Sequence, residues 1–130
     1  MEYIRIIAKD RKGLLTEVSE LVGRHDINID AINALSEKGY AQIKLATADN
    51  DRALSVLNEA GFKGVPDDNI LVGIKDTPGE LGRISRQLSE NDIDIRAITM
   101  IEQNQGINIV AIVTDRDAKA KEILDDILVK

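Results

Sequence analysis

The sequence repeats itself, and this repeat limits the possible folds more than any other feature of the chain. Shifted by about 66 residues, the first half matches the second at spaced positions. The clearest match is Asp26-Ile27-x-Ile29-x-Ala31-Ile32, which recurs as Asp92-Ile93-x-Ile95-x-Ala97-Ile98. Further matched pairs are Ile4/Ile70, Lys9/Lys75, Asp10/Asp76, Gly13/Gly79, Leu15/Leu81 and Ser19/Ser85. We therefore expect two copies of one domain, residues 1–66 and 67–130, divided in the turn-rich segment 66–69.

Both copies have the same predicted order of elements. Each begins with a β-rich segment and continues with an amphipathic helix, a hairpin of two strands and a second helix. In the first copy these are residues 3–8, a helix with Leu14, Leu15, Val18, Leu21 and Val22 on its apolar stripe, strands at 27–29 and 40–47, a helix at 51–60 and a strand at 62–65. In the second copy they are residues 70–74, a helix with Leu81, Ile84 and Leu88, strands at 93–95 and 107–114, and a helix at 117–126, with a C-terminal strand that is short or missing.

This order predicts the fold class. We expect an α+β protein made of two tandem ferredoxin-like βαββαβ units, in which each antiparallel sheet carries its helices on one face. The chain has 130 residues, so each unit is small. Such a fold hosts many unrelated functions, and the function has to come from particular residues.

Composition excludes several of these functions. The net charge of −6 and an aromatic content of 2% argue against nucleic acid as a partner. The absence of Cys, together with His25 as the one histidine, leaves few residues for a metal centre, a thiol nucleophile or a catalytic triad. The longest uncharged run, residues 103–114, is too short to cross a bilayer. We therefore expect a cytoplasmic protein with no catalytic residues, no metal, no cofactor and no membrane or nucleic-acid partner.

Two loop motifs point to a particular class of domain. Asp10-Arg11-Lys12-Gly13-Leu14-Leu15 and Asp76-Thr77-Pro78-Gly79-Glu80-Leu81 each precede a helix and then an Ile-Asn-Ile or Ile-Asp-Ile segment. In this combination the chain resembles a tandem ACT domain protein over essentially its whole length. The resemblance implies a small regulatory module that binds amino acids at domain interfaces. The first copy departs from the pattern, because Lys12 stands where it has proline.

The resemblance also implies where a ligand binds, between the first loop of one domain and the second strand of its neighbour. The first turn of a helix attracts a carboxylate, and Gly13 and Gly79 allow close approach to the backbone there. Asn28 and Asp94 offer acceptors for an ammonium group. The residues implied as ligand-binding are Asp10, Lys12, Gly13, Leu14, Asn28 and Ile29 in the first copy, and Asp76, Pro78, Gly79, Glu80, Asp94 and Ile95 in the second.

Plainer structural roles stay open for several of these residues. Thr77 and Glu80 fit a capping box at the start of a helix. Asp10 and Asp76 fit turn or cap positions, and Asn28 and Asp94 fit the solvent side of a half-exposed strand. His25 aligns with Asn91 at the end of the first helix and fits a helix terminator.

These observations favour a non-enzymatic protein that binds a small amino acid and changes its contacts in response. Two alternatives are a regulatory subunit of an amino-acid biosynthetic enzyme, similar to the small subunit of acetolactate synthase, and a dimerisation scaffold without a ligand. The second copy also predicts a homodimer. One face of its third strand carries Ile107, Ile109, Ala111 and Val113, and Ile98 and Met100 are expected to extend this apolar face.

Overall fold

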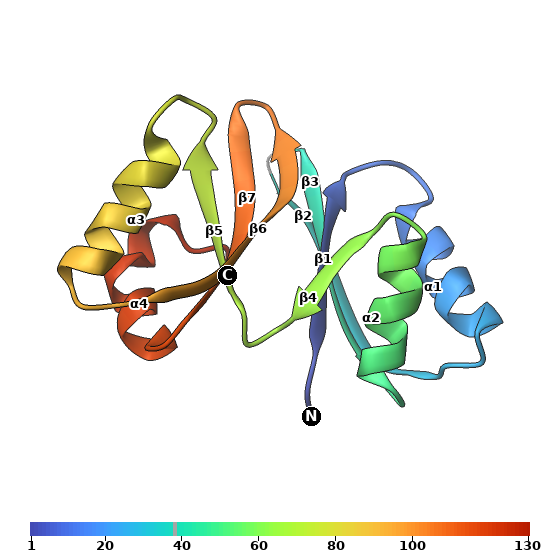
Figure 1. Cartoon of the computed structure of the whole chain (residues 1–130). Helices are drawn as coiled ribbons and strands as arrows, with labels where there is room; N and C mark the ends of the chain where they lie inside the picture. The colour runs from blue at the N-terminus through green and yellow to red at the C-terminus, as the bar shows by residue number, and fades with distance from the viewer. Residues whose placement is uncertain (38) are drawn as a thin grey trace. The chain divides into compact units, whose positions relative to one another are not determined.

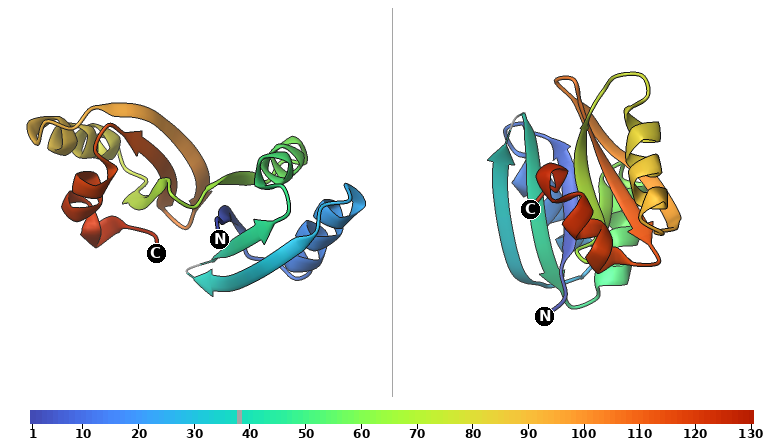
Figure 2. Two further views of the ribbon diagram at one scale, coloured as in Figure 1. Left: turned by 90° about the horizontal axis from the view of Figure 1, so that it is seen from below. Right: turned by 90° about the vertical axis from the view of Figure 1, so that its left-hand side faces the viewer.

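In the computed structural model, which describes residues 1–37 and 39–130, the chain divides into two units, Met1–Asp67 and Asp68–Lys130 (Figure 1). The predicted α+β fold is confirmed in both. Each unit has an antiparallel sheet with its two helices on one face (Figure 2).

The described part of the first unit contains the complete βαββαβ order. Its elements are β1 (Ile4–Lys9), α1 (Leu14–Arg24), β2 (Ile29–Glu37), β3 (Tyr40–Thr47), α2 (Asn50–Glu59) and β4 (Lys63–Pro66). The strands lie side by side in the order β2-β3-β1-β4, so β2 is an edge strand. On α1, Leu14, Val18 and Val22 recur every four residues and face the sheet, where they are buried. Burial of each such side chain stabilises the unit by about 1.5–3 kcal/mol.

The second unit repeats this order with a reduced C-terminal end. Its elements are β5 (Ile70–Lys75), α3 (Glu80–Glu90), β6 (Ile95–Asn104), β7 (Ile107–Thr114), α4 (Asp117–Ile123) and a 3-10 turn, η1 (Asp125–Ile127). Throughout residues 68–130, which are all described, the sheet has the order β5-β7-β6. A single bridge between Val72 and Leu128, with the bond from Val129 N to Leu71 O, stands where β4 lies in the first unit.

The second strands differ from their predicted form. β2 and β6 begin at Ile29 and Ile95 and run on for nine and ten residues, whereas Ile27 and Ile93 precede them as buried loop residues. Only the last residue of each predicted triplet, Ile29 or Ile95, therefore belongs to the strand, as its first residue. The unbroken run that follows each triplet, without proline or glycine, is the signal for the longer strand.

Three predictions about exposure are wrong. Leu15 and Leu81 belong to the predicted apolar stripes but are 44% and 42% exposed, because they lie beyond the edge of the helix face that covers the sheet. The apolar side of β7 was expected to be uncovered, yet Ile109 is 2% exposed. Ile98 and Met100 do not extend that side. They pair with Ile112 and Val110 and share the helix-covered face, since directly opposed residues of antiparallel strands point the same way.

The predicted helix terminators lie at the ends of α1 and α3. His25 and Asn91 are the C-cap residues, and each places a side-chain nitrogen near the carbonyl of the residue four positions earlier, at 3.0 and 2.8 Å. Neither is left-handed. That conformation falls one residue later, on Asp26 and Asp92, with φ of 61° and 62°.

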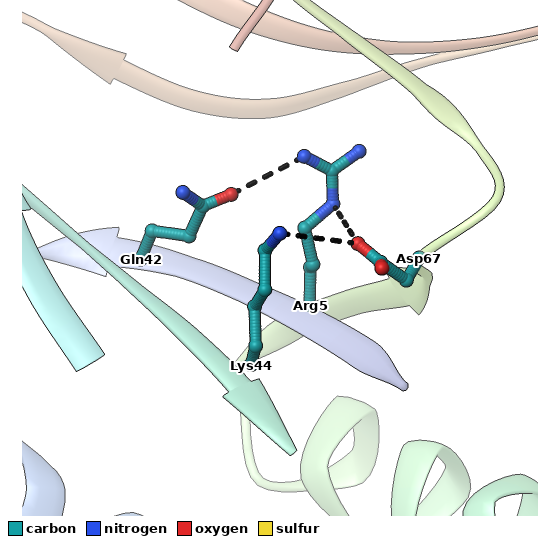
Figure 3. Close-up of polar contacts among 4 residues, drawn as sticks. All are labelled: Arg5, Gln42, Lys44 and Asp67. Carbon is teal, nitrogen blue, oxygen red and sulfur yellow. Dashed lines mark hydrogen bonds and ion pairs between the residues drawn. The ribbon is translucent and has the colours of Figure 1, made fainter. Parts of the chain in front are cut away.

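A charged cluster lies on the helix-free face of the first sheet (Figure 3). Arg5 Nε is 2.9 Å from Oδ1 of Asp67, and Arg5 Nη1 donates a 3.2 Å hydrogen bond to Gln42 Oε1. Lys44 Nζ lies 3.8 Å from the same Asp67 oxygen. Burial lowers the pKa of Arg5, and the charge of Asp67 opposes that shift.

Candidate ligand-binding site

The loop between β1 and α1 leaves the start of the helix open. Gly13 is the N-cap of α1 and has a left-handed backbone with φ of 84°, a conformation that favours glycine. If Gly13 carried a Cβ, no heavy atom of the described residues would lie within 4 Å of it, apart from atoms of Gly13 itself and of the residues next to it in sequence. The first turn of α1 therefore presents its N–H groups and partial positive charge without a covering side chain.

A cavity of about 300 Å³ joins this helix start to the edge strand β2. It is lined by Asp10, Arg11, Gly13, Leu14, Leu15, Thr16, Ala34, Leu35, Ser36, Ala41 and Ile43. Strand pairing explains how these segments meet. Ala41 at the start of β3 lies opposite Ala8 near the end of β1 and opposite Ser36 near the end of β2. The loop after β1 and the end of β2 are thus at the same edge of the unit.

The lining combines a polar end with an apolar floor. Ala41 and Ile43 are buried and form apolar surface, and Leu15 lies half-exposed beside them. Asp10 supplies a carboxylate, and Arg11 forms an ion pair with Glu17 of α1. This arrangement can bind a carboxylate at the helix start, an ammonium at Asp10 and a small side chain on the floor. Its volume is at the lower end of the range of about 300–1,000 Å³ for small-molecule sites.

The structure brings only part of the first predicted set to this cavity. Asp10, Gly13 and Leu14 line it, whereas Lys12 lies in the same loop without lining it. Ile29 pairs with Thr47 at the opposite end of β2 from Ser36, and Asn28 comes just before it. Asn28 donates from Nδ2 to Asp30 Oδ1 over 2.8 Å. A role for Asn28 and Ile29 toward a ligand held by a neighbouring domain stays a prediction.

In the second unit, the corresponding loop has the same backbone form. Gly79 is the N-cap of α3, with φ of 88°, so the predicted capping box is wrong: Thr77 is not the cap residue, and the cap residue has no side chain to accept from the helix N–H groups. Pro78 precedes it. Glu80 instead accepts hydrogen bonds from Nε and Nη2 of Arg83, at 3.3 and 3.1 Å, and these bonds lower the pKa of Glu80.

The predicted strand residues of this unit lie at a separate cavity. A space of about 450 Å³ is lined by Gly82, Ser85, Arg86, Ser89, Ile93, Asp94 and Ile95. In this cavity Asp94 and Ile95 lie next to residues from the middle and end of α3, away from the loop 76–79. Asp94 N donates to Asp115 Oδ1 over 2.9 Å. Within this unit the two halves of the predicted site are thus apart.

Several site residues lie outside the predicted set. These are Arg11, Leu15, Thr16, Ala34, Leu35, Ser36, Ala41 and Ile43. The length of β2 could have indicated some of them, because an edge strand that runs to Glu37 returns to the loop after β1. The contribution of β3 depends on strand register and had no sequence signal.

The described residues contain no group of three or more His, Cys, Asp or Glu side chains placed to hold a metal ion. None of their helices has both the length and the apolar character needed to cross a membrane.

Comparisons with known proteins support the fold. Residues 3–61 match the family model of the ACT domain. The chain is similar to a solved structure of a protein from Bacteroides thetaiotaomicron, with a TM-score of 0.50 and 22% identity over 98% of this chain and 90% of that one. It is also similar to the regulatory subunit of aspartate kinase from Thermus thermophilus (TM-score 0.44, 17% identity, 96% and 91% coverage). A third similar structure is the acetolactate synthase small subunit from Thermotoga maritima, with a TM-score of 0.42 and 12% identity over 99% of this chain and 89% of that one. No curated protein matches the chain.

Proposed function

The first unit of this chain matches the ACT domain over residues 3–61, and from that premise we propose that the chain is a regulatory protein that binds a free amino acid and catalyses no reaction. The observation that carries the proposal is the cavity between the start of α1 and the end of β2. A helix N-terminus beside a carboxylate and a small apolar floor suits a zwitterion with a modest side chain.

In this proposal each part of the site has one task. The first-turn amides of α1 bind the ligand carboxylate, and the lack of a side chain at Gly13 lets that group approach them. The carboxylate of Asp10 accepts hydrogen bonds from the ligand ammonium. The floor formed by Ala41 and Ile43 contacts the ligand side chain. The corresponding loop of the second unit, Asp76 to Glu80, acts in the same way.

A regulatory protein of this kind acts by changing its contacts with a partner chain when the ligand binds. The exposed apolar side chains of the edge strands support this part of the proposal. Ile32 and Leu35 on β2 are 44% and 43% exposed, and Ile98 and Met100 on β6 are 39% and 37% exposed. Edge strands with exposed apolar side chains readily pair with another chain. We propose a second copy of this chain as the partner, joined through β6, with an enzyme as the alternative.

A thermal-shift screen against the twenty amino acids tests the proposed function. A ligand at 100 times its dissociation constant raises the free energy of unfolding by about 2.7 kcal/mol, which is readily detected. We expect stabilisation by one amino acid or by a few of related shape. The absence of any shift at millimolar concentration, with each of the twenty, would contradict the proposal.

A further inference from the structure

Among the positions that differ between the two units, one lies in the sheet under the ligand loops and exchanges an apolar for a polar side chain. Ala41 lies opposite Ala8 in the first sheet, and Asn108 lies opposite Ile74 at the matching place in the second. Ala41 lines the floor of the first cavity. Asn108 shares the helix-covered face of β7 with Val110 and Ile112, and only 6% of it is exposed. A buried amide thus replaces a methyl group beneath the second loop.

The orientation of this amide follows from its neighbour. Asn108 Nδ2 donates a 3.1 Å hydrogen bond to Oδ1 of Asp76, the first residue of the loop motif. A carboxylate accepts hydrogen bonds and cannot donate them when ionised, so the nitrogen must face Asp76. Asn108 Oδ1 is therefore turned away from Asp76. It is buried and accepts no hydrogen bond from any residue that the structure describes.

A buried carbonyl oxygen without a donor is costly, and native structures seldom keep one without a reason. Resting on the proposed function, we propose that Asn108 sets the specificity of the second unit, which selects an amino acid whose side chain carries a hydrogen-bond donor. Asn108 Oδ1 and the Asp76 carboxylate are the acceptors for that donor. The first unit, with Ala41 and Ile43 at its floor, selects an apolar side chain.

The donor for Asn108 Oδ1 comes from the ligand's side chain rather than from its ammonium group, as a comparison of the two loops indicates. Both loops have an aspartate and a left-handed glycine at matching places, Asp10 with Gly13 and Asp76 with Gly79. Shared residues suit the groups that every amino acid has. A polar residue that only one unit has, such as Asn108 in place of Ala41, suits the part of the ligand that differs. A site built around a hydrogen bond also strongly rejects an analogue that lacks the donor.

The test uses the full chain and a readout for each site, the amide NMR signals of Gly13 and Gly79. The probes are three pairs of similar shape: threonine and valine, serine and alanine, asparagine and leucine. We expect the Gly79 signal to saturate at roughly tenfold lower concentration with the polar member of a pair than with its apolar member. Asn108→Ala removes that difference, and the reciprocal variant Ala41→Asn introduces it at the Gly13 signal.

Each other outcome overturns the inference, and the outcomes separate it from the proposed function. Equal saturation by both members at Gly79, or a preference that survives Asn108→Ala, shows that Asn108 does not select. Equal weakening of both members assigns its oxygen to the ligand ammonium. A response at Gly13 alone overturns the inference and leaves the proposed function standing, whereas the absence of a response to all twenty amino acids at both signals removes both. Should Asn108→Ala fail to fold, Ala41→Asn decides, because Ala41 lines the first cavity.

Discussion

Arg5 Nε lies 2.9 Å from Oδ1 of Asp67, and this ion pair ties the last residue of the first unit to the middle of its sheet (Figure 3). The backbone of Asp67 is held as well, since its N–H donates to Tyr3 O over 2.9 Å. The Arg5 side chain is 7% exposed and that of Asp67 is 34% exposed. The guanidinium therefore depends on Asp67 for much of its compensation for burial.

The first prediction concerns this pair. Asp67→Asn should lower the free energy of unfolding by about 1–3 kcal/mol, because it removes the carboxylate from a buried cation. Urea denaturation measures the change. Asp68→Asn is the matched control: it alters the neighbouring exposed aspartate and should change stability by less than about 0.5 kcal/mol. Equal effects of the two variants would show that the ion pair does not stabilise the unit.

The second prediction contrasts two adjacent leucines of α1. Leu14 is 4% exposed and belongs to the core, so Leu14→Ala should destabilise the protein by about 2–5 kcal/mol. Leu15 is 44% exposed and lines the cavity. Leu15→Lys should leave the melting temperature almost unchanged and abolish stabilisation by the amino acid found in the screen. Full ligand stabilisation of Leu15→Lys would remove the cavity from the site.

The third prediction uses two left-handed glycines. Gly13 and Gly61 have φ of 84° and 94°, and a Cβ would meet open space at both. Asparagine tolerates this conformation, so each Gly→Asn variant should fold with a loss of about 1 kcal/mol or less. Gly13→Asn should also lose ligand-induced stabilisation, because its side chain covers the helix start. Gly61→Asn, outside the cavity lining, should keep it, and loss of binding in both would point to a general effect on folding.

The fourth prediction concerns pH. The hydrogen bonds from Arg83 lower the pKa of Glu80 below its usual 4.5 in the folded protein. A lowered folded-state pKa contributes stability above the unfolded-state pKa, and that contribution is lost as the pH falls through the folded-state value. Arg83→Gln should therefore reduce the loss of stability between about pH 6 and pH 3, as measured by thermal unfolding. We expect a small effect because this ion pair lies at the surface, where the Arg83 side chain is 59% exposed and that of Glu80 is 22% exposed. Identical pH profiles would show that the bonds do not persist in solution.

The fifth prediction concerns self-association. Met100→Lys on the edge strand β6 should convert a dimer into a monomer without unfolding it, because the side chain is 37% exposed. Light scattering gives the mass, and far-ultraviolet circular dichroism gives the folding control. Ile109→Lys is less suitable for this purpose, since Ile109 is 2% exposed and a lysine there would have to bury its charge. A chain that is monomeric before substitution would contradict the proposed dimer.

Much of the fold could be predicted because it depends on patterns that are local in the chain. The four-residue spacing of Leu14, Val18 and Val22 requires a helix with one buried face, whatever lies opposite. Repetition of the whole pattern after about 66 residues then predicts the second unit. The loop with Asp10, Gly13 and Leu14 was identified from the resemblance of its motif to that of the ACT domain, and such a motif is also local in the chain.

The tertiary structure decided which distant residues share a site. Ser36, Ala41 and the loop after β1 meet because antiparallel pairing sets them at one edge of the sheet, and register has no local signature in the sequence. The same pairing separates Asn28 from the cavity and places Asn108 beneath Asp76. Local spacing determines helices and strands through contacts along the chain, whereas a binding site depends on contacts between strands that only the packed fold brings together.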